Sequence, residues 1–276
     1  MLRRVPLVPI ARADDPRVSG YAGIRDRDLR ADHDQFIVEG EVVVRMLLSP
    51  SSRFRVRSLF LEERRAEKLE DALARLPDDV PVYVAPQSLM DGLVGFPIHR
   101  GVLALADRRV ETVADALPVD GGENAMAVGL LGVVNHDNVG GIFRSAAAFG
   151  ARAVLLDPVT CDPLYRKAVR VSVGGSLVVP FARAASEDAL LDAFAERGFE
   201  LLALSADGAS DIDELAGARR VALLIGAEGP GLSPSVLRRA KGVRIPMQRT
   251  LDSLNASVAC GIALFSVARA LGKAGR

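Results

Sequence analysis

Apolar residues in the second half of the chain form short runs with few polar interruptions, and stretches with helical spacing separate them. The runs lie at residues 125–134, 151–158, 176–182, 199–206, 220–228 and 243–247. The helical stretches lie at residues 140–150, 163–175, 187–198, 233–240 and 251–271. Strands that are apolar on both faces and alternate with helices are typical of a parallel sheet covered by helices on both sides. We therefore predict such a sheet, with ligands expected beyond the carboxyl ends of its strands.

The first half of the chain has the pattern of a smaller α/β unit. Helices are predicted at residues 36–49, 65–76 and 87–94, and strands at residues 53–63, 80–85 and 101–107. The stretch 108–125 is polar and contains Pro118, Gly121 and Gly122, which is typical of a connection between domains. The predicted organisation is an extension at 1–22, a first domain at 23–110, a linker at 111–124 and a second domain at 125–276.

The composition indicates a globular protein of a reducing compartment. The 276 residues, of which 49% are hydrophobic, are enough for two domains with buried cores. Lysine and arginine together number 35, as do aspartate and glutamate, so the net charge does not favour nucleic acid. Cys161 and Cys260 are too few for a disulfide framework or a metal cluster. We expect a cytoplasmic protein without metal, secretion signal or membrane span.

Three loops that follow predicted strands carry polar and glycine residues that an apolar core does not require. The motifs are N-H-D-N-V-G-G-I-F-R at 135–144, I-G-A-E-G-P-G at 225–231, and I-P-M at 245–247 with S-L-N-A-S at 253–257. Taken singly, each has an ordinary interpretation: a polar turn before a helix, a tight glycine turn, or N-cap residues that satisfy free backbone donors. Glycines also let a backbone approach a ligand closely, and the amides of such a loop suit anionic groups.

The glycine-rich motif at 225–231 raises the alternative of a dinucleotide-dependent oxidoreductase. Its spacing is G-x-x-G-x-G instead of G-x-G-x-x-G, and no acidic residue stands about 20 positions later. The motif also lies near the end of its domain, whereas a dinucleotide fingerprint belongs to a first βαβ unit. The oxidoreductase interpretation is therefore the weaker one.

Together and in this order, the three motifs resemble those of the SpoU (TrmH) family of RNA ribose 2'-O-methyltransferases, in the SPOUT superfamily. The resemblance covers residues 127–265 and rests on N-x-x-N-x-G-x-x-x-R, I-G-x-E-G-x-G, and I-P-M with S-L-N-x-S. It implies an α/β fold with a SPOUT-type parallel sheet, a C-terminal trefoil knot, a homodimer, and S-adenosyl-L-methionine bound in the knot. It also implies that the first domain is a small RNA-binding unit similar to ribosomal protein L30e.

The resemblance assigns roles to residues by their places in the motifs. Catalysis and ribose positioning fall on Asn138, Arg144, Glu228, Ser253 and Asn255. The methyl-donor site falls on Leu204, Ser205, Gly226, Ile245, Met247 and Leu254. His136 matches no family role.

Two mechanisms remain open for Arg144. Holding the ribose hydroxyl in line with the donor methyl is worth about 7–11 kcal/mol, but the hydroxyl must also lose its proton. In one mechanism a desolvated Arg144 close to other cations is the base. In the other, Arg144 stays charged, pairs with an RNA phosphate and stabilises the developing alkoxide, while water or Ser253 takes the proton. We favour the second, because removing a proton from an arginine is energetically expensive.

RNA contacts are expected from patches of arginine. Arg53, Arg55 and Arg57 alternate, so on a strand they share one face and form a candidate phosphate track. Arg166 and Arg170 form a second candidate. Ribosomal RNA, 23S in particular, is the favoured substrate, because the first domain resembles that of rRNA-directed family members. A tRNA substrate, base methylation, a role in antibiotic resistance and a catalytically silent RNA-binding or assembly factor are the alternatives.

Overall fold

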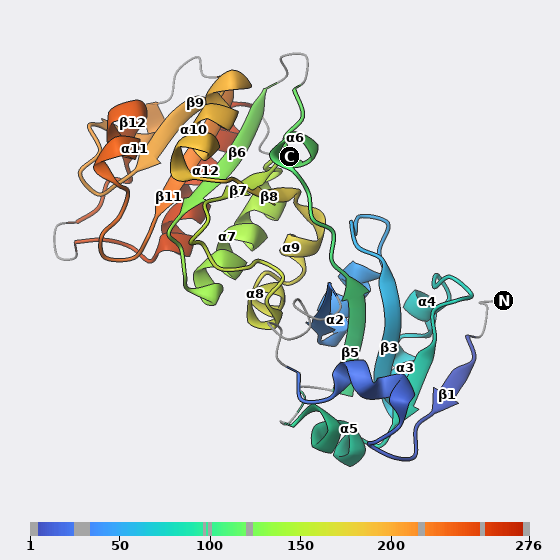
Figure 1. Ribbon diagram of the computed structural model, residues 1–276. Coiled ribbons are helices and arrows are strands. Elements are labelled where there is room, and N and C mark those ends of the chain that lie inside the picture. The colour runs from blue at the N-terminus through green and yellow to red at the C-terminus, as the bar shows by residue number, and fades with distance from the viewer. Residues whose placement is uncertain are drawn as a thin grey trace. The chain divides into compact units, whose positions relative to one another are not determined.

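The strands of the chain form two separate sheets (Figure 1), in a computed structural model that describes residues 5–24, 34–95, 98, 101–119, 124–214, 219–248 and 252–272. The chain divides into a first unit, Met1–Arg109 with Leu164–Val178, and a second unit, Val110–Pro163 with Val179–Arg276. Residues 120–123 of the predicted linker, and the first residue of the helix predicted at 251–271, lie outside the described residues.

The sheet of the first unit has five strands in the order β1-β4-β3-β5-β2. They are β1 (Leu7–Pro9), β2 (Gln35–Glu39), β3 (Val56–Glu62), β4 (Val82–Ala85) and β5 (Val102–Asp107). The neighbours β1, β4 and β3 are parallel, whereas β5 pairs antiparallel with both β3 and β2. The helical elements before residue 110 are η1 (Pro16–Tyr21), α2 (Glu41–Leu47), α3 (Glu63–Lys68), α4 (Glu70–Leu73) and α5 (Gln87–Val94).

The prediction of one helix at 36–49 was wrong, because this stretch forms β2 followed by α2. Phe36, Ile37 and Val38 are fully buried on consecutive positions, which suits a strand covered on both faces better than a helix. Gly40 then adopts φ 96°, a conformation that other residues rarely take, and turns the chain from the strand into the helix.

Residues 1–22 are not a separate extension where the structure describes them. β1 adds an edge strand to the sheet by pairing with β4. Val18 and Tyr21 of η1 are buried, and the Tyr21 hydroxyl shares a 2.7 Å hydrogen bond with Ser58 Oγ. The first thirty residues are rich in arginine, and their apolar side chains are spaced irregularly, so they gave no periodic signal of this packing.

The sheet of the second unit has seven strands in the order β10-β12-β9-β11-β6-β7-β8. They are β6 (Ala125–Leu131), β7 (Val154–Leu156), β8 (Phe181–Arg183), β9 (Glu200–Leu204), β10 (Ser210–Asp211), β11 (Arg220–Gly226) and β12 (Lys241–Arg244). All neighbouring pairs are parallel, which confirms the predicted parallel sheet.

Helices cover both faces of this sheet (Figure 1). The helical elements are α6 (Val113–Ala116), α7 (His136–Phe149), α10 (Glu187–Glu196), η3 (Ile212–Glu214), α11 (Pro234–Arg239) and α12 (Ala256–Ala270). Alternate residues of β6 enter different cores: Met126 and Val128 pack with α7 and α12, whereas Ala127 packs with α10 and α11. In the described part of the chain, no helix combines the length and apolar character needed to cross a bilayer.

The segment 164–178 belongs to the first unit, although the predicted boundaries assign it to the second domain. It contains α8 (Arg166–Val171) and α9 (Gly175–Val178), so the strand predicted at 176–182 is a helical turn before the shorter β8. Arg53 N donates a 3.0 Å hydrogen bond to Leu177 O. Arg166 Nη1 donates at 2.5 Å to Glu39 Oε2, whose side chain is buried. These partners are more than 100 positions apart in the sequence, so local patterns do not reveal the contact.

Candidate active site

A cavity of about 760 Å³ lies where β9, β11 and β12 end. Because the three strands are parallel, their carboxyl ends meet at one edge of the sheet, where ligands of such sheets bind. Most of the lining comes from the loop after β9, the glycine-rich loop after β11, and the segment between β12 and α12, and the helices α11 and α12 add a few residues. The cavity therefore joins the second and third sequence motifs to a loop that carries neither.

The loop after β11 depends on glycine for its shape. Gly229 and Gly231 have φ values of 88° and 70°, in the region that favours glycine. A Cβ atom on Gly226 would lie 2.4 Å from the carbonyl carbon of Gly231, so only a residue without a side chain fits. Gly231 N donates a 3.0 Å hydrogen bond to Ala227 O and closes the turn. The part of the cavity wall that this loop forms is thus backbone folded tightly on itself.

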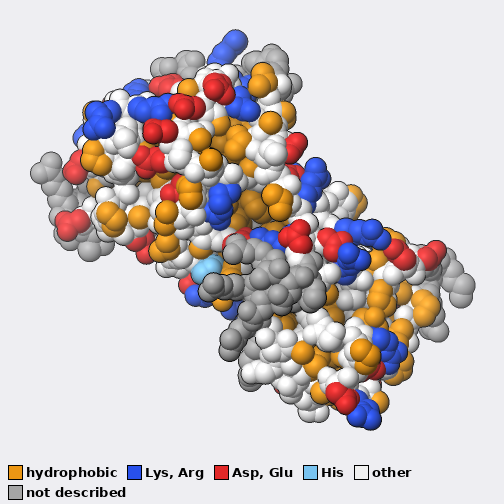
Figure 2. All heavy atoms as spheres, in the orientation of Figure 1, with side chains coloured by type: hydrophobic (Ala, Val, Ile, Leu, Met, Phe, Trp, Pro, Cys, Tyr) orange, Lys and Arg blue, Asp and Glu red, His pale blue; other side chains and the backbone are white. Residues whose placement is uncertain are grey.

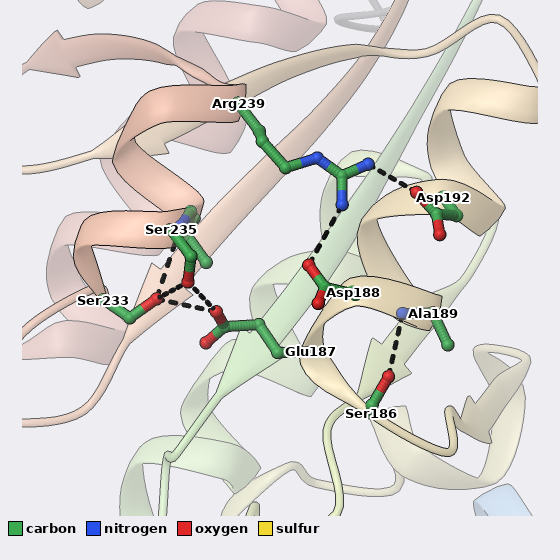
Figure 3. A network of polar contacts seen from close by, with 9 residues as sticks. Ser186, Glu187, Asp188, Ala189, Asp192, Ser233, Ser235 and Arg239 are labelled. Atoms are coloured by element: carbon green, nitrogen blue, oxygen red, sulfur yellow. Dashed lines mark hydrogen bonds and ion pairs between the residues drawn. The ribbon is translucent and has the colours of Figure 1, made fainter.

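The helix after this loop, α11, is held against α10 by polar contacts (Figure 3). Glu187 Oε1 accepts hydrogen bonds from Ser233 Oγ at 2.7 Å and Ser235 Oγ at 2.5 Å. Ser233 is also the N-cap of α11. At the other end of α11, the Arg239 guanidinium pairs with Asp188 at 3.2 Å and Asp192 at 2.5 Å. The glycine-rich loop is therefore anchored directly beyond its last residue.

Three of the predicted catalytic residues form one hydrogen-bonded network beside the cavity. Asn138 Nδ2 donates to Glu228 Oε1 at 2.5 Å, and Asn255 Nδ2 donates to Asn138 Oδ1 at 2.8 Å and to Glu228 Oε1 at 3.4 Å. Asn138 is 2% exposed, so its amide is fixed within the protein. Glu228 and Asn255 line the cavity. The network joins the first motif, on α7, to the second and third.

Asn255 is both the N-cap of α12 and a member of the hydrogen-bonded network. Its Oδ1 atom accepts hydrogen bonds from Ser257 N at 3.0 Å and Val258 N at 3.3 Å, as the N-cap of α12. Its Nδ2 atom is left to donate to Asn138 and Glu228. The cap therefore orients the amide that serves the network.

The other two predicted catalytic residues stand apart from this network. Ser253 lines the cavity and is exposed, without a hydrogen bond to any described residue. Arg144 is exposed on α7, and its guanidinium pairs with no described residue. It follows Asn138 by six positions, which places it about 240° further round the helix, on a different side. One chain thus presents Arg144 to solvent and Asn138 to the protein interior.

All six residues predicted for the methyl-donor site line the cavity: Leu204, Ser205, Gly226, Ile245, Met247 and Leu254. Sequence reasoning missed Asp207, Leu237 and Asp252, which line it as well. Leu237 is 45% exposed on α11, and an exposed leucine on an otherwise polar helix face was the available signal. The two aspartates carried none, because acidic residues are frequent throughout the chain.

A second missed pair shapes the approach to the first motif. Asp157 Oδ2 accepts a hydrogen bond from Gly132 N at 2.9 Å, and Thr160 Oγ1 accepts one from Val133 N at 3.2 Å. Both side chains are buried, at 7% and 2% exposed. They pin the turn between β6 and α7, and thereby the start of the helix that carries Asn138. Polar residues at the end of the apolar run 151–158 and just after it were the available sequence signal.

The structure does not bring the predicted RNA-binding arginines onto one strand face. β3 begins at Val56, so Arg53 and Arg55 precede it and only Arg57 lies within it. Arg55 pairs with Asp79 at 2.7 Å, and Arg57 pairs with Asp107 at 2.5 Å. A register shift between Val56 and Ser58 also interrupts the pairing of β3 with β5 at Arg57, and an RNA contact by these arginines stays a prediction.

Arg166 and Arg170 are also engaged within the protein. Their Nη1 atoms lie 2.5 Å and 3.4 Å from the buried carboxylate of Glu39. A buried carboxylate depends on such partners, because an uncompensated charge in the interior is strongly destabilising. These arginines therefore have a structural task, which the sequence did not reveal.

The two cysteines have no disulfide and are poor nucleophiles. Burial raises the pKa of Cys260 to about 12. Partial burial, with the neighbouring Asp162 charge, raises the pKa of Cys161 to about 11. Both thiols are therefore protonated at neutral pH, and the thiolate is the reactive form. The described residues include no group of three or more His, Cys, Asp or Glu side chains arranged to hold a metal ion.

Comparisons with known proteins agree on one family. The profile of the SpoU rRNA Methylase family matches residues 125–265. A protein described as an uncharacterized tRNA/rRNA methyltransferase of Mycobacterium tuberculosis is 42% identical over 265 residues, which cover 93% of this chain and 90% of the relative.

Two solved structures resemble the whole chain. The AdoMet-bound rRNA methyltransferase of Sinorhizobium meliloti has a TM-score of 0.78 at 25% identity and covers 95% of this chain and 98% of its own. The SpoU methyltransferase AviRb of Streptomyces viridochromogenes, in complex with the cofactor AdoMet, has a TM-score of 0.77 at 26% identity and covers 95% and 100%. The family profile spans just over half of the chain and contains all three motifs, and the chain belongs to the SpoU methylase family.

Proposed function

We propose that this protein transfers a methyl group from S-adenosyl-L-methionine to a ribose 2'-hydroxyl of RNA, with 23S rRNA the favoured substrate and tRNA the alternative. The observation that carries the proposal is the network of Asn138, Glu228 and Asn255 at the edge of the cavity. It places a carboxylate and two amides, all held by the protein, beside a cavity built from family motifs. Such preorganised polar groups stabilise charge that develops in a transition state.

The residues that line the cavity suit the binding of S-adenosyl-L-methionine. Leu204, Ile245, Met247 and Leu254 provide apolar walls for an adenosyl group, and the backbone of the tight glycine turn approaches it without side chains. When bound, the cofactor supplies an activated methyl group on a sulfonium. The residues of this chain position the acceptor and exclude water, which contributes most of the rate acceleration in a simple displacement.

For Arg144 we propose the charged role. A base role requires that the guanidinium be withdrawn from water, whereas the side chain is exposed on α7. An exposed guanidinium can pair with a phosphate of the RNA and stabilise the alkoxide that forms on the ribose. Water or Ser253, which lines the cavity, takes the hydroxyl proton as the alkoxide forms.

Variants of Arg144 test this role. Arg144→Ala is expected to lower kcat/KM for RNA by roughly 10²-fold, and Arg144→Lys to recover part of the loss, because a lysine keeps the charge without the bidentate geometry. The measurement is single-turnover methylation across pH 6–10. Under the charged role the Lys variant has the pH profile of the wild type. A profile displaced along the pH axis in the Lys variant would show that residue 144 is itself the base.

We further propose that the second unit contains a trefoil knot and that the first unit resembles ribosomal protein L30e. β12 lies between β9 and β10 in the sheet, although only residues 205–209 join β9 to β10. A Cβ atom on Gly208 would lie 2.3 Å from the carbonyl carbon of Val243, so this connection passes directly over β12. A knot requires a short loop that closes over a strand, with the chain continuing from that strand into another helix. Such knots are rare among folds.

A homodimer is proposed from an apolar groove between α7 and α12. Val258, Ile262 and Phe265 of α12 are 51%, 40% and 45% exposed along one side of the helix. Gly141, Ser145 and Phe149 of α7 line the same groove. A contiguous apolar surface of this kind marks an interaction site, and a second copy of the same chain buries it symmetrically. Arg144 lies on the exposed side of the same helix α7.

Ile262→Glu is expected to convert the dimer to a monomer, because each interface would then bury two carboxylates without partners. The molar mass in solution, measured by light scattering after gel filtration, reports the change. Val159→Glu is the matched control, since Val159 is 64% exposed in the same unit and outside the groove. A wild-type protein that is monomeric, or an Ile262→Glu variant that remains dimeric, contradicts this interface.

The RNA and the compartment follow from the same proposal. We propose a cytoplasmic location, where the RNA substrate is found. The two cysteines form no disulfide, which is typical of proteins in this reducing compartment. Ribose methylation mapped across total RNA from a strain lacking the gene is expected to show one rRNA position without its methyl group. A missing methyl group in tRNA would select the alternative substrate. No change in any RNA would favour a catalytically silent RNA-binding factor.

A further inference from the structure

Among the described arginines of the first unit, more than half pair with acidic neighbours, and blue and red side chains are interspersed in Figure 2. The pairs are Arg12–Asp14, Arg17–Asp15, Arg45–Asp71, Arg55–Asp79, Arg57–Asp107, Arg166–Glu39 and Arg170–Glu39. A phosphate that binds one of these cations must compete with a carboxylate already in place. Cations without such a partner are therefore the stronger candidates for a polyanion contact.

Three cations of this kind gather on α3. The side chains of Arg64, Arg65 and Lys68 make no ion pair or hydrogen bond with any described residue. All three line a hollow of about 390 Å³, together with Glu62 and Gln87. The hollow thus carries three positive charges against one negative charge, on a chain whose total charge is zero.

The positive and negative side chains of α3 lie on different sides of the helix. At 100° per residue, Arg64, Arg65 and Lys68 fall within an arc of about 100°, and Glu63 and Glu67 fall outside it. Both glutamates are exposed and neither lines the hollow. The acidic residues of this segment therefore do not cancel the field inside the hollow at short range.

A fixed amide lies beside the three cations. Gln87 Nε2 donates to Asp91 Oδ1 at 2.8 Å and to Ile98 O at 3.4 Å, which leaves Oε1 without a described donor. Gly101 has φ 58°, and a Cβ atom there would lie 2.4 Å from Gln87 Oε1. Glycine at this position is therefore what allows the amide to lie here, oriented before any ligand arrives.

We propose that this hollow binds the RNA substrate, with Arg64, Arg65 and Lys68 contacting consecutive phosphates and Gln87 Oε1 accepting a hydrogen bond from a sugar hydroxyl or base amino group between them. The inference rests on the proposed function, because it names the surface that holds the RNA of the methylation reaction. Unpaired cations supply affinity that falls with salt, and the fixed acceptor favours a nucleotide over a simple anion.

Two triple variants of the full-length protein test the proposal, and both remove three positive charges from the first unit. The first is Arg64→Gln with Arg65→Gln and Lys68→Gln. The second, the matched control, is Arg53→Gln with Arg55→Gln and Arg57→Gln, on the track predicted from sequence. Purified bacterial 16S and 23S rRNA is the probe, and filter binding gives Kd between 50 and 300 mM KCl. Methyl transfer is measured on the same RNA.

The α3 triple is expected to raise Kd by 10- to 100-fold near 100 mM KCl and to reduce the slope of log K against log salt by about 2, since each lost phosphate contact removes 0.7–0.9. The apparent KM for RNA rises and kcat at saturating RNA stays within twofold. The control triple changes Kd by less than threefold. Equal losses in the two triples, or an unchanged Kd in the α3 triple, would overturn the proposal.

Two further outcomes separate this inference from the function on which it rests. If the wild type binds rRNA but transfers no methyl group to any RNA, the proposed function fails, and the difference in Kd between the two triples still decides the binding site. Polyglutamate is the competing probe. If it displaces rRNA from the wild-type protein, binds that protein as tightly as rRNA does, and loses this affinity in the α3 triple, the hollow recognises an acidic polypeptide and the RNA proposal is wrong.

Discussion

Asn138→Ala is expected to lower kcat for methyl transfer by roughly 10²- to 10³-fold, the largest effect of any single side chain in the network. Asn138 is the buried member of the network and makes its two shorter hydrogen bonds, so its loss leaves Glu228 and Asn255 with only the 3.4 Å contact between them. Removing one partner of a buried polar pair costs more than the net value of the hydrogen bond. Steady-state kinetics with labelled S-adenosyl-L-methionine measure the loss.

Asn124→Ala is the matched control for this variant. Asn124 Nδ2 donates to Leu271 O at 3.1 Å, and Asn124 does not line the cavity. Its replacement removes the same amide and should leave kcat within twofold. The melting temperature of Asn138→Ala separates lost chemistry from lost folding. Retention of half of the wild-type kcat by Asn138→Ala would mean that the network is structural.

Gly226→Ala is expected to abolish binding of S-adenosyl-L-methionine, with Kd raised by at least 100-fold. The added methyl group would lie 2.4 Å from Gly231 C, 2.5 Å from Gly231 O and 2.6 Å from Leu232 N. These are backbone atoms, so the clash cannot be relieved by a side-chain rotation and the glycine-rich loop must move. The loop is anchored at α11 by Ser233 and Glu187, which restricts that movement to the cavity wall. Isothermal titration calorimetry measures the affinity.

Gly242→Ala controls for the general effect of adding a methyl group to the second unit. The nearest atoms to a Cβ on Gly242 lie at 3.6 Å, an ordinary van der Waals distance, and this residue lies in β12 outside the cavity lining. Its donor affinity should remain within twofold of the wild type. If Gly226→Ala binds the donor normally, the cofactor does not occupy this cavity.

The apolar runs predicted the parallel sheet of the second unit because its strands are buried on both faces. Residues 125–131 are all buried, and their length and lack of alternation point to such a strand. The same reasoning misread residues 36–39, where a buried strand and a helix follow each other within one apolar run. Periodicity does not separate a buried strand from a buried helix over so few residues.

The composition of the cavity followed from the motifs, but the network beside it did not. The resemblance placed six donor-site residues, four of them within the motifs and Leu204 and Ser205 outside them, and all six line the cavity. The contacts of Asn138 reach 90 and 117 positions along the chain, to Glu228 and Asn255. Contacts of that range depend on the order of strands in the sheet, which no local pattern specifies.

The arginines were the least predictable feature, because their partners are distant in sequence. Arg55 and Arg57 pair with residues 24 and 50 positions away. A sequence shows that an arginine is present and does not show whether its charge is compensated. The structure supplies that information, and it redirects attention from the predicted track to the cations of α3.

The most direct test of the proposed function is the chemical position of the transferred methyl group. The purified protein is incubated with methyl-labelled S-adenosyl-L-methionine and unmethylated rRNA, and the RNA is digested to nucleosides and separated by chromatography with mass detection. We predict label in one 2'-O-methylnucleoside, and a rate of labelling roughly 10²- to 10³-fold lower when Asn138→Ala replaces the wild type. Label on a base, or no label from a protein that binds the donor, would contradict it.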